Sequence, residues 1–329
     1  MSVAPEAHSV VRGARGVVAI GGGHGLARAL AALRGLGLRP TAIVTAADDG
    51  GSSGRLRRDL DIIAPGDLRR ALLSLARDRA LAEVLAHRFD AGELAGHALG
   101  NLLLVALAER EGDIVSALDR AAGLLDCAGR VLPSTTTPVD LVARIDGAEV
   151  HGQRRITTAG ADVEALALDP ADPPACAEAV AAIDAAEAIV LGPGSLHTSV
   201  VANLLVPGIR EAVGRSQATL VAVANLRTQA GEDPGLDADG HLAVVLDALA
   251  GRQVDHLVVN DGPVRCDAGT RPLRVDAAAA AGPQAEQRVG AIVRADLAER
   301  DERGEAGAAH DPGRLGAVLA DLLAIPRGP

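Results

Sequence analysis

Two glycine-rich segments follow short apolar runs, and each could hold a phosphate group. Residues 21–25 read Gly-Gly-Gly-His-Gly and follow the apolar run 16–20, while residues 192–195 read Gly-Pro-Gly-Ser and follow the run 188–191. Glycines let the backbone approach a phosphate closely, and the free N–H groups at a helix start attract the anion. The alternative is a tight turn without a ligand. The candidate ligand-binding residues are Gly21, Gly22, Gly23, His24, Gly25, Gly192, Pro193, Gly194, Ser195, Thr198 and Ser199.

An acidic segment follows the second apolar run, residues 41–45. It reads Asp-Asp-Gly-Gly-Ser-Ser-Gly-Arg over residues 48–55. Two carboxylates at the end of a parallel strand face the crevice in which α/β proteins bind ligands. They could hold Mg²⁺ or accept ribose hydroxyls, or they could merely cap a helix and fill a turn. The candidate ligand-binding residues are Asp48, Asp49, Gly50, Gly51, Ser52, Ser53 and Arg55, and the candidate metal ligands are Asp48, Asp49 and Asp61.

Several single polar residues extend these candidates. His97 and Asn101 lie four positions apart and would share a helix face if the helix began before Gly100, although a packing histidine is an equal alternative. Asn225, Thr228 and Gln229 follow another apolar run and are expected at the same edge of the sheet. Residues 192–197 do not form the G-x-S-x-G turn of hydrolases, because His197 stands in place of the last glycine.

The elements that position these residues alternate between strand and helix. A strand over 16–20, a glycine turn, a helix over 26–36 and a strand over 41–45 form a βαβ unit, which implies a parallel sheet and the α/β class. We expect a flexible tail over residues 1–14 and a single domain over 15–329. A strand-rich insert is expected at about 130–170, with strands over 139–145 and 154–158, and a surface loop over 301–309.

Composition excludes several classes of protein. The 329 residues contain 32 basic side chains, all of them arginine, and carry a net charge of −11. Without lysine there is no Walker-type loop, kinase strand lysine or Schiff base, and the acidic balance disfavours nucleic acid as a partner. The three cysteines are scattered, which predicts a reduced, cytoplasmic protein with buried thiols. No apolar stretch long enough to insert into a membrane is present.

The glycine and acidic motifs, together with Pro-Gly-Asp-Leu-Arg over 65–69, closely resemble the YvcK family of gluconeogenesis factors in the CofD-like superfamily. The resemblance continues through segments 96–101, 130–133, 191–195, 203–208 and 310–312 and covers about residues 15–325. It implies a Rossmann-like, mostly parallel sheet with helices on both faces. It also adds Asp67 and Arg69 to the ligand-binding candidates.

In function, the resemblance implies a cytosolic regulator that binds a nucleotide sugar such as UDP-N-acetylglucosamine. Such a regulator would act on gluconeogenic carbon metabolism, cell-wall precursor supply and cell shape. A regulatory protein partner and a homodimer are left open. Where the family commonly has aromatic residues this chain has His197 and Leu236, and Ala309 stands where a basic residue is frequent. The base would therefore lack an aromatic stacking partner.

Two enzymatic alternatives stay open. The enzyme branch of the same superfamily transfers phospholactate from an activated nucleotide to a deazaflavin, with a metal ion such as Mg²⁺ held by acidic residues. A dinucleotide-binding oxidoreductase is suggested by the glycine turn, but the G-x-G-x-x-G fingerprint would need a glycine where Leu26 stands. Whether the protein is an enzyme is therefore not decided by the sequence.

Overall fold

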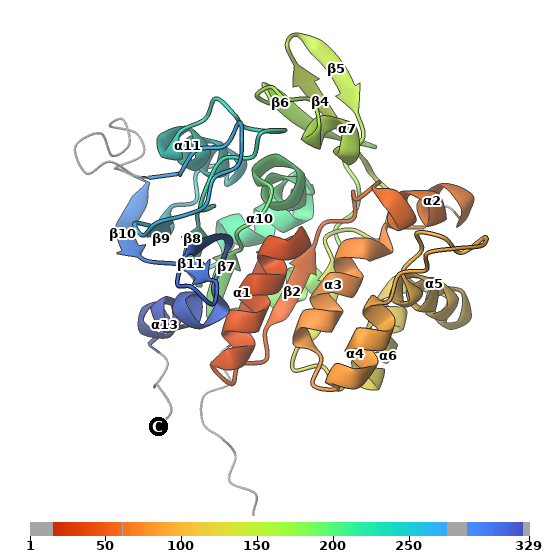
Figure 1. Cartoon of the computed structure of the whole chain (residues 1–329). Helices are drawn as coiled ribbons and strands as arrows, with labels where there is room; N and C mark the ends of the chain where they lie inside the picture. The colour runs from red at the N-terminus through yellow and green to blue at the C-terminus, as the bar shows by residue number, and fades with distance from the viewer. Residues whose placement is uncertain (1–15, 61, 275–287, 325–329) are drawn as a thin grey trace, which may run out of the picture.

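A sheet of seven parallel strands lies at the centre of the computed structural model, which describes residues 16–60, 62–274 and 288–324. The strand order is β10-β9-β8-β7-β1-β2-β3 (Figure 1). The strands are β1 (Val17–Gly21), β2 (Thr41–Val44), β3 (Arg130–Pro133), β7 (Ala188–Leu191), β8 (Thr219–Val223), β9 (Val254–Asn260) and β10 (Val289–Ala295). Strands β1 and β7 are apolar and buried throughout, as expected for strands covered on both faces.

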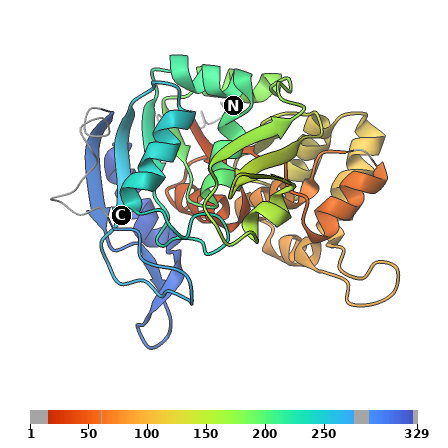
Figure 2. The same cartoon turned by 90° about the horizontal axis from the view of Figure 1, so that it is seen from above.

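Helices cover both faces of this sheet, as expected. Helices α1 and α13 pack together on one face with α3, while α8 and α10 contact each other on the opposite face (Figure 2). The helices are α1 (Gly23–Gly35), α2 (Gly51–Leu60), α3 (Pro65–Leu75), α4 (Arg79–Ala86), α5 (Leu99–Glu111), α6 (Ile114–Leu124), α7 (Gln153–Thr157), α8 (Ala177–Asp184), α9 (Ala202–Leu204), α10 (Pro207–Arg215), α11 (Ala238–Ala248) and α13 (Pro312–Leu322). A π-helical turn, Leu196–Val201, precedes α9.

The strand order reverses between β1 and β7. The chain runs from β1 outward through β2 to β3, then returns to the other side of β1 and continues through β7 to β10. At such a switch point the loops after the two central strands diverge and leave a crevice at their carboxyl ends. The two glycine segments are these two loops, so the fold places them on either side of the crevice.

A small antiparallel sheet, β5-β4-β6, lies beyond this carboxyl edge (Figure 1). It comprises β4 (Asp140–Ile145), β5 (Ala148–His151) and β6 (Ala165–Asp169). Two expectations about the insert need correction. Residues 130–133 belong to the large sheet, where β3 pairs with β2. Residues 154–158, expected as a strand, lie in and directly after α7, whose first turn donates a hydrogen bond to a side chain outside the insert, Asp49.

The carboxyl-terminal part also differs from expectation. Residues 301–309 are not a simple surface loop, because they contribute to a hairpin of β11 (Ala298–Arg300) and β12 (Ala306–His310). Strand β10, which was not expected, extends the parallel sheet beyond β9. The predicted tail over residues 1–14 and the candidate metal ligand Asp61 lie outside the described residues. Among the described helices, none combines the length and apolar character that crossing a membrane requires.

Candidate functional site

The amino terminus of α1 forms the floor of the crevice. Its first-turn N–H groups have no carbonyl partner within the helix, and that of Gly23 donates to Asp67 Oδ2 at 2.8 Å. Gly23 has φ +60°, which favours glycine. A Cβ on Gly25 would lie 2.1 Å from the carbonyl oxygen of Pro193. The two glycine loops are therefore in backbone contact, and Gly25 is required for that contact.

Cationic side chains surround this helix terminus. Burial lowers the pKa of His24, and the neighbouring Arg70, Arg28 and Arg69 lower it further. Arg69 is 8% exposed, and its Nε has no hydrogen-bond partner among the described residues. Burial, followed by Arg70 and Arg88, lowers the pKa of Arg69 to about 10. The carboxylates of Asp48 and Asp67 lie beside the same arginines and raise the pKa of Arg69 in opposition. The helix N–H groups and the unpartnered Nε of Arg69 are the groups here that suit an anion such as a diphosphate.

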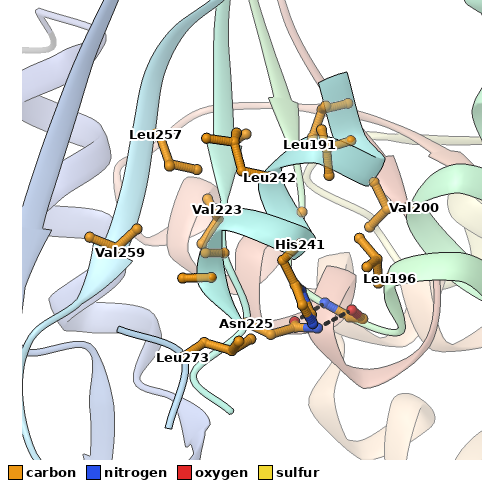
Figure 3. A pocket seen from close by; sticks show the side chains of 16 residues that line it. Leu191, Leu196, Val200, Val223, Asn225, His241, Leu242, Leu257, Val259 and Leu273 are labelled. Atoms are coloured by element: carbon orange, nitrogen blue, oxygen red, sulfur yellow. Dashed lines mark hydrogen bonds between the residues drawn. The ribbon is translucent and has the colours of Figure 1, made fainter. Parts of the chain in front are cut away.

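The loop after β7 is held by the loop after β8. Asn225 Oδ1 accepts from Gly194 N at 2.9 Å, and Asn225 Nδ2 donates to Gly194 O at 2.7 Å (Figure 3). Gln229 Nε2 donates to Ser195 Oγ at 3.2 Å. Thr228 is buried, and its hydroxyl accepts from Arg271 N at 3.0 Å. Asn225, Thr228 and Gln229 thus position the loops, and all three also line the large cleft described below.

A buried polar network supports the loop after β7 from beneath. Thr198 Oγ1 donates to Glu232 Oε1 at 2.6 Å, and Asp233 Oδ2 lies 2.6 Å from His241 Nε2. Burial raises the pKa of Glu232 and lowers the pKa of His197 to about 4. Sequence reasoning missed Glu232, Asp233 and His241, because adjacent acids in a loop usually face solvent. The hydroxyl of Thr198 is therefore already used in this network. The hydroxyl of Ser199 instead faces Gly22, where a Cβ added to Gly22 would lie 3.1 Å from Ser199 Oγ.

The two acidic residues of the second motif point in different directions. Asp48 Oδ1 accepts from Gly50 N at 2.9 Å. Burial and, second, the charge of Asp48 raise the pKa of Asp67 to about 6. Asp49 Oδ1 accepts from Arg154 N at 2.8 Å, so it fastens the insert. The described residues contain no group of three or more His, Cys, Asp or Glu side chains that could hold a metal ion. Asp48 and Asp67, whose charges interact, are the carboxylates that could join ligand phosphates in binding Mg²⁺.

The other predicted residues near α2 form a structural cluster. Helix α5 begins at Leu99, so His97 precedes the helix instead of sharing a face with Asn101. Ser52 joins the two, with Oγ 3.1 Å from His97 Nδ1 and accepting from Asn101 Nδ2 at 3.0 Å. Arg55 donates to Ala95 O at 2.8 Å. A Cβ on Gly66 would lie 2.2 Å from Ser53 Oγ, so α3 packs tightly against α2 here.

Two cavities adjoin the glycine loops. A cleft of about 680 Å³ extends from α1 past the loop after β8 to β12. It is lined by His24, Gly25, Ala27, Arg28, Pro193, Gly194, Asn225, Leu226, Arg227, Thr228, Gln229, Ala230, Asp267, Ala268, Thr270, Ala308, Ala309 and His310. A second cavity of about 40 Å³, mostly apolar, lies between α11 and the ends of β7, β8 and β9 (Figure 3). The large cleft has the size of a small-molecule site, and the small one can take only a few atoms.

The cleft is also lined by residues that were not candidate ligands, among them the polar side chains Arg28, Arg227 and His310. Arg28 pairs with Glu299 at 2.9 Å, and Arg227 pairs with Asp267 at 2.6 Å. The segment 310–312 contains the cap of α13, Asp311, which accepts from Arg314 N at 2.8 Å, while His310 precedes it and lines the cleft. Arg28 could have been found as the residue one helical turn after His24. His310 lies in the segment 310–312 that carries the family resemblance, whereas no motif or spacing pointed to Arg227.

Comparisons with known proteins agree on one family. The family model described as 2-phospho-L-lactate transferase CofD matches residues 17–292. The chain is 40% identical over 322 residues to a Mycobacterium tuberculosis protein named "Putative gluconeogenesis factor", covering 94% of this chain and 90% of that protein. It is 43% identical over 253 residues to a gluconeogenesis factor of Halalkalibacterium halodurans, covering 76% and 79%. A crystal structure of a Bacillus halodurans protein superimposes with a TM-score of 0.84 at 34% identity, covering 92% of this chain and 98% of that one.

Proposed function

The chain belongs to the CofD family, among its gluconeogenesis factors, and from this premise we propose that it is a regulator that binds a nucleotide sugar. The ligand class is a UDP-N-acetylglucosamine-like molecule. Binding would report the supply of such sugars to carbon metabolism, cell-wall synthesis and cell shape in the cytoplasm. The proposal thus goes beyond the family membership, because it names a ligand, the nucleotide sugar, and the processes that its binding would regulate.

One observation carries the proposal: an anion site and a large cleft meet at the same switch point. The terminus of α1, with His24 and Arg69 beside it, suits a diphosphate. The cleft of about 680 Å³ begins at that terminus and is lined by polar groups and short aliphatic side chains. A molecule with a diphosphate between two sugar-bearing parts matches this combination of one anion site and one neutral cleft.

Calorimetric titration with UDP-N-acetylglucosamine, UDP, ADP-glucose and NAD, each in Mg²⁺ and in EDTA, tests the proposal. Arg28→Gln removes a cation one helical turn from His24 and should weaken diphosphate ligands about tenfold at low salt, with a smaller loss at high salt. Arg34→Gln is the matched control, because Arg34 lies in the last turn of the same helix and donates to Ala76 O. If the parent protein, Arg28→Gln and Arg34→Gln bound the diphosphate ligands with equal affinity, the proposed anion site would be contradicted.

Selectivity for the base is expected to be weak. His197, at a position where the family commonly has an aromatic residue, is 3% exposed and does not line the large cleft. Stacking on an aromatic ring contributes about 1–3 kcal/mol per base in single-strand binding proteins. UDP- and ADP-sugars should therefore bind within about tenfold of each other. A hundredfold preference for uridine would require another recognition device.

A transferase related to the enzyme whose model matches is the second candidate. The observation in its favour is the proximity of Asp48 and Asp67, whose charges interact at the edge of the crevice. Asp48 would hold Mg²⁺ together with ligand phosphates, and the ion would neutralise charge on the leaving phosphate. Turnover of a phospholactyl-nucleotide with a deazaflavin, lost in Asp48→Asn, would establish this activity. The oxidoreductase alternative gains no support, because Leu26 is a buried core residue and the matched family is CofD.

A further inference from the structure

Two residues that line the large cleft each carry a buried side-chain atom without a hydrogen-bond partner among the described residues. They are His310 Nε2, at the end of β12, and Gln229 Oε1, in the loop after β8. Both residues line the cleft, yet they come from segments 81 positions apart in the chain. A buried acceptor without a donor is destabilising, so two such atoms on residues of one cleft call for a functional explanation.

The hydrogen bonds of His310 determine what it can offer a ligand. His310 is 5% exposed, and a hydrogen bond to the backbone of Ala224 raises its pKa, which identifies the ring as the donor and the carbonyl as the acceptor. Burial nevertheless lowers its pKa to about 4, so the ring is neutral at pH 7. With Nδ1 donating to Ala224, Nε2 carries a lone pair and can only accept.

Gln229 is fixed in a comparable way. Its Nε2 donates to Ser195 Oγ at 3.2 Å, which ties it to the loop after β7 and leaves Oε1 as an acceptor. Arg227, two positions before Gln229, is paired with Asp267, which also lines the cleft. The charges beside Gln229 therefore balance, and this end of the cleft is rich in acceptors, in contrast to the α1 terminus with Arg28.

The chemistry of a ligand that fits is narrow. Ionised phosphate oxygens only accept, so they would leave both acceptors unsatisfied. Sugar hydroxyls donate, and a ring carrying two of them can serve two acceptors at once. The ribose and the hexose of a nucleotide sugar both carry such hydroxyls.

We propose that His310 and Gln229 bind hydroxyl groups of a sugar ring of the ligand and thereby select sugar-bearing nucleotides over simple phosphates. This inference rests on the proposed function, because it assumes that a nucleotide sugar occupies the cleft. In this arrangement Arg69 and the α1 terminus bind the diphosphate, and His310 and Gln229 accept hydrogen bonds from hydroxyl groups of the adjacent sugar.

The test compares variants against four probes by calorimetry: UDP-N-acetylglucosamine, UDP, 2′,3′-dideoxy-UDP and inorganic pyrophosphate. His310→Asn keeps an amide nitrogen near the position of Nδ1, to donate to Ala224, and removes the acceptor at Nε2. Gln229→Met removes the second acceptor at similar length. His151→Asn is the matched control, because His151 is exposed on β5 and pairs with Glu149. Thermal melts confirm that each variant is folded.

Each cleft variant should lose about tenfold in affinity for UDP-N-acetylglucosamine and bind pyrophosphate unchanged, and the control should bind all probes as the parent does. If the hydroxyls are those of ribose, the loss persists with UDP and disappears with the dideoxy ligand. If they belong to the hexose, the loss is absent with UDP. Equal losses with pyrophosphate, or unchanged affinity for UDP-N-acetylglucosamine, would overturn the inference while leaving the proposed function intact. A parent protein that binds none of the nucleotides would overturn both.

Discussion

Gly25 illustrates how a single glycine can hold the two halves of the site together. Its hydrogen atom faces the backbone of Pro193, where a Cβ would lie 2.1 Å from the carbonyl oxygen and 2.6 Å from Gly194 Cα. Backbone atoms cannot move aside as a flexible side chain can. A methyl group at this position must therefore separate the loop after β1 from the loop after β7.

We predict that Gly25→Ala lowers the free energy of unfolding by about 1–3 kcal/mol and weakens nucleotide binding. Gly35→Ala is the control, since Gly35 ends the same helix and a Cβ there meets no atom within 4 Å. That change should raise stability by about 0.4–1 kcal/mol. Urea denaturation measures both variants, and a Gly25→Ala protein as stable as the parent would refute the contact.

His197 gives a pH dependence of stability that can be checked. Burial lowers its pKa to about 4, whereas the ring titrates near 6.5 in an unfolded chain. Its contribution to stability is therefore complete above pH 6.5 and is lost as the pH falls through about 4. The loss amounts to about 3 kcal/mol at most. His197→Gln should flatten the decline in unfolding free energy over this range, whereas His151→Gln, at an exposed site, should not; equal slopes in all three proteins would contradict the burial effect.

At the scale of elements, the insert is fastened at two points. Asp49, after β2, accepts from Arg154 N at the start of α7, and Asp162 accepts from Gly235 N at 2.8 Å in the loop after β8. A Cβ on Gly231 would lie 1.6 Å from Thr157 O, so that loop also packs closely on the insert. The insert thus connects loops from the two halves of the large sheet.

We expect Asp49→Ala to release one of these attachments. Amide hydrogen exchange should become faster over residues 152–158, and stability should fall by about 1 kcal/mol. Asp78→Ala is the matched control, because Asp78 caps α4 through Leu81 N at 2.9 Å, an equivalent bond away from the insert. Asp78→Ala should lower the free energy of unfolding by a similar amount and leave amide hydrogen exchange in the insert unchanged. Unaltered exchange in Asp49→Ala would show that the attachment does not restrain the insert.

For the whole molecule, one apolar core extends from the large sheet into the insert. Leu141 of β4 and Ile156 of α7 are fully buried members of the same cluster as Ile20 of β1 and Ile43 of β2. Packing of this kind couples the insert to the rest of the domain. The described residues should therefore unfold as a single cooperative unit.

Differential scanning calorimetry should show one transition, with a calorimetric enthalpy equal to the van't Hoff enthalpy. Leu141→Ala removes a buried side chain from the insert and should destabilise the protein by about 2–5 kcal/mol. Its single transition should move to lower temperature without splitting. A separate early transition in this variant would mean that the insert unfolds independently.

The sequence alone determined the features that depend on local chemistry. Short apolar runs, followed by glycine at β1 and β7 and by the acidic motif at β2, identified these three strands, because a strand buried on both faces requires apolar side chains. The same runs placed both glycine loops at one edge of a parallel sheet, since parallel strands share their carboxyl ends. The order of motifs identified the family, which the comparisons confirmed.

Only the tertiary structure decided how distant residues use their polar atoms. Asp48 and Asp49 are neighbours in sequence, yet one interacts with Asp67 and the other fastens the insert, because side-chain direction depends on backbone torsion angles. Likewise, Gln229 lies in the loop after β8 and His310 at the end of β12, and no periodicity in the sequence indicates that these segments are adjacent. Strand β3 was assigned to the insert for the same reason. It pairs with β2 through residues that are 89 positions apart in the chain, and the local sequence pattern does not indicate such a long-range contact.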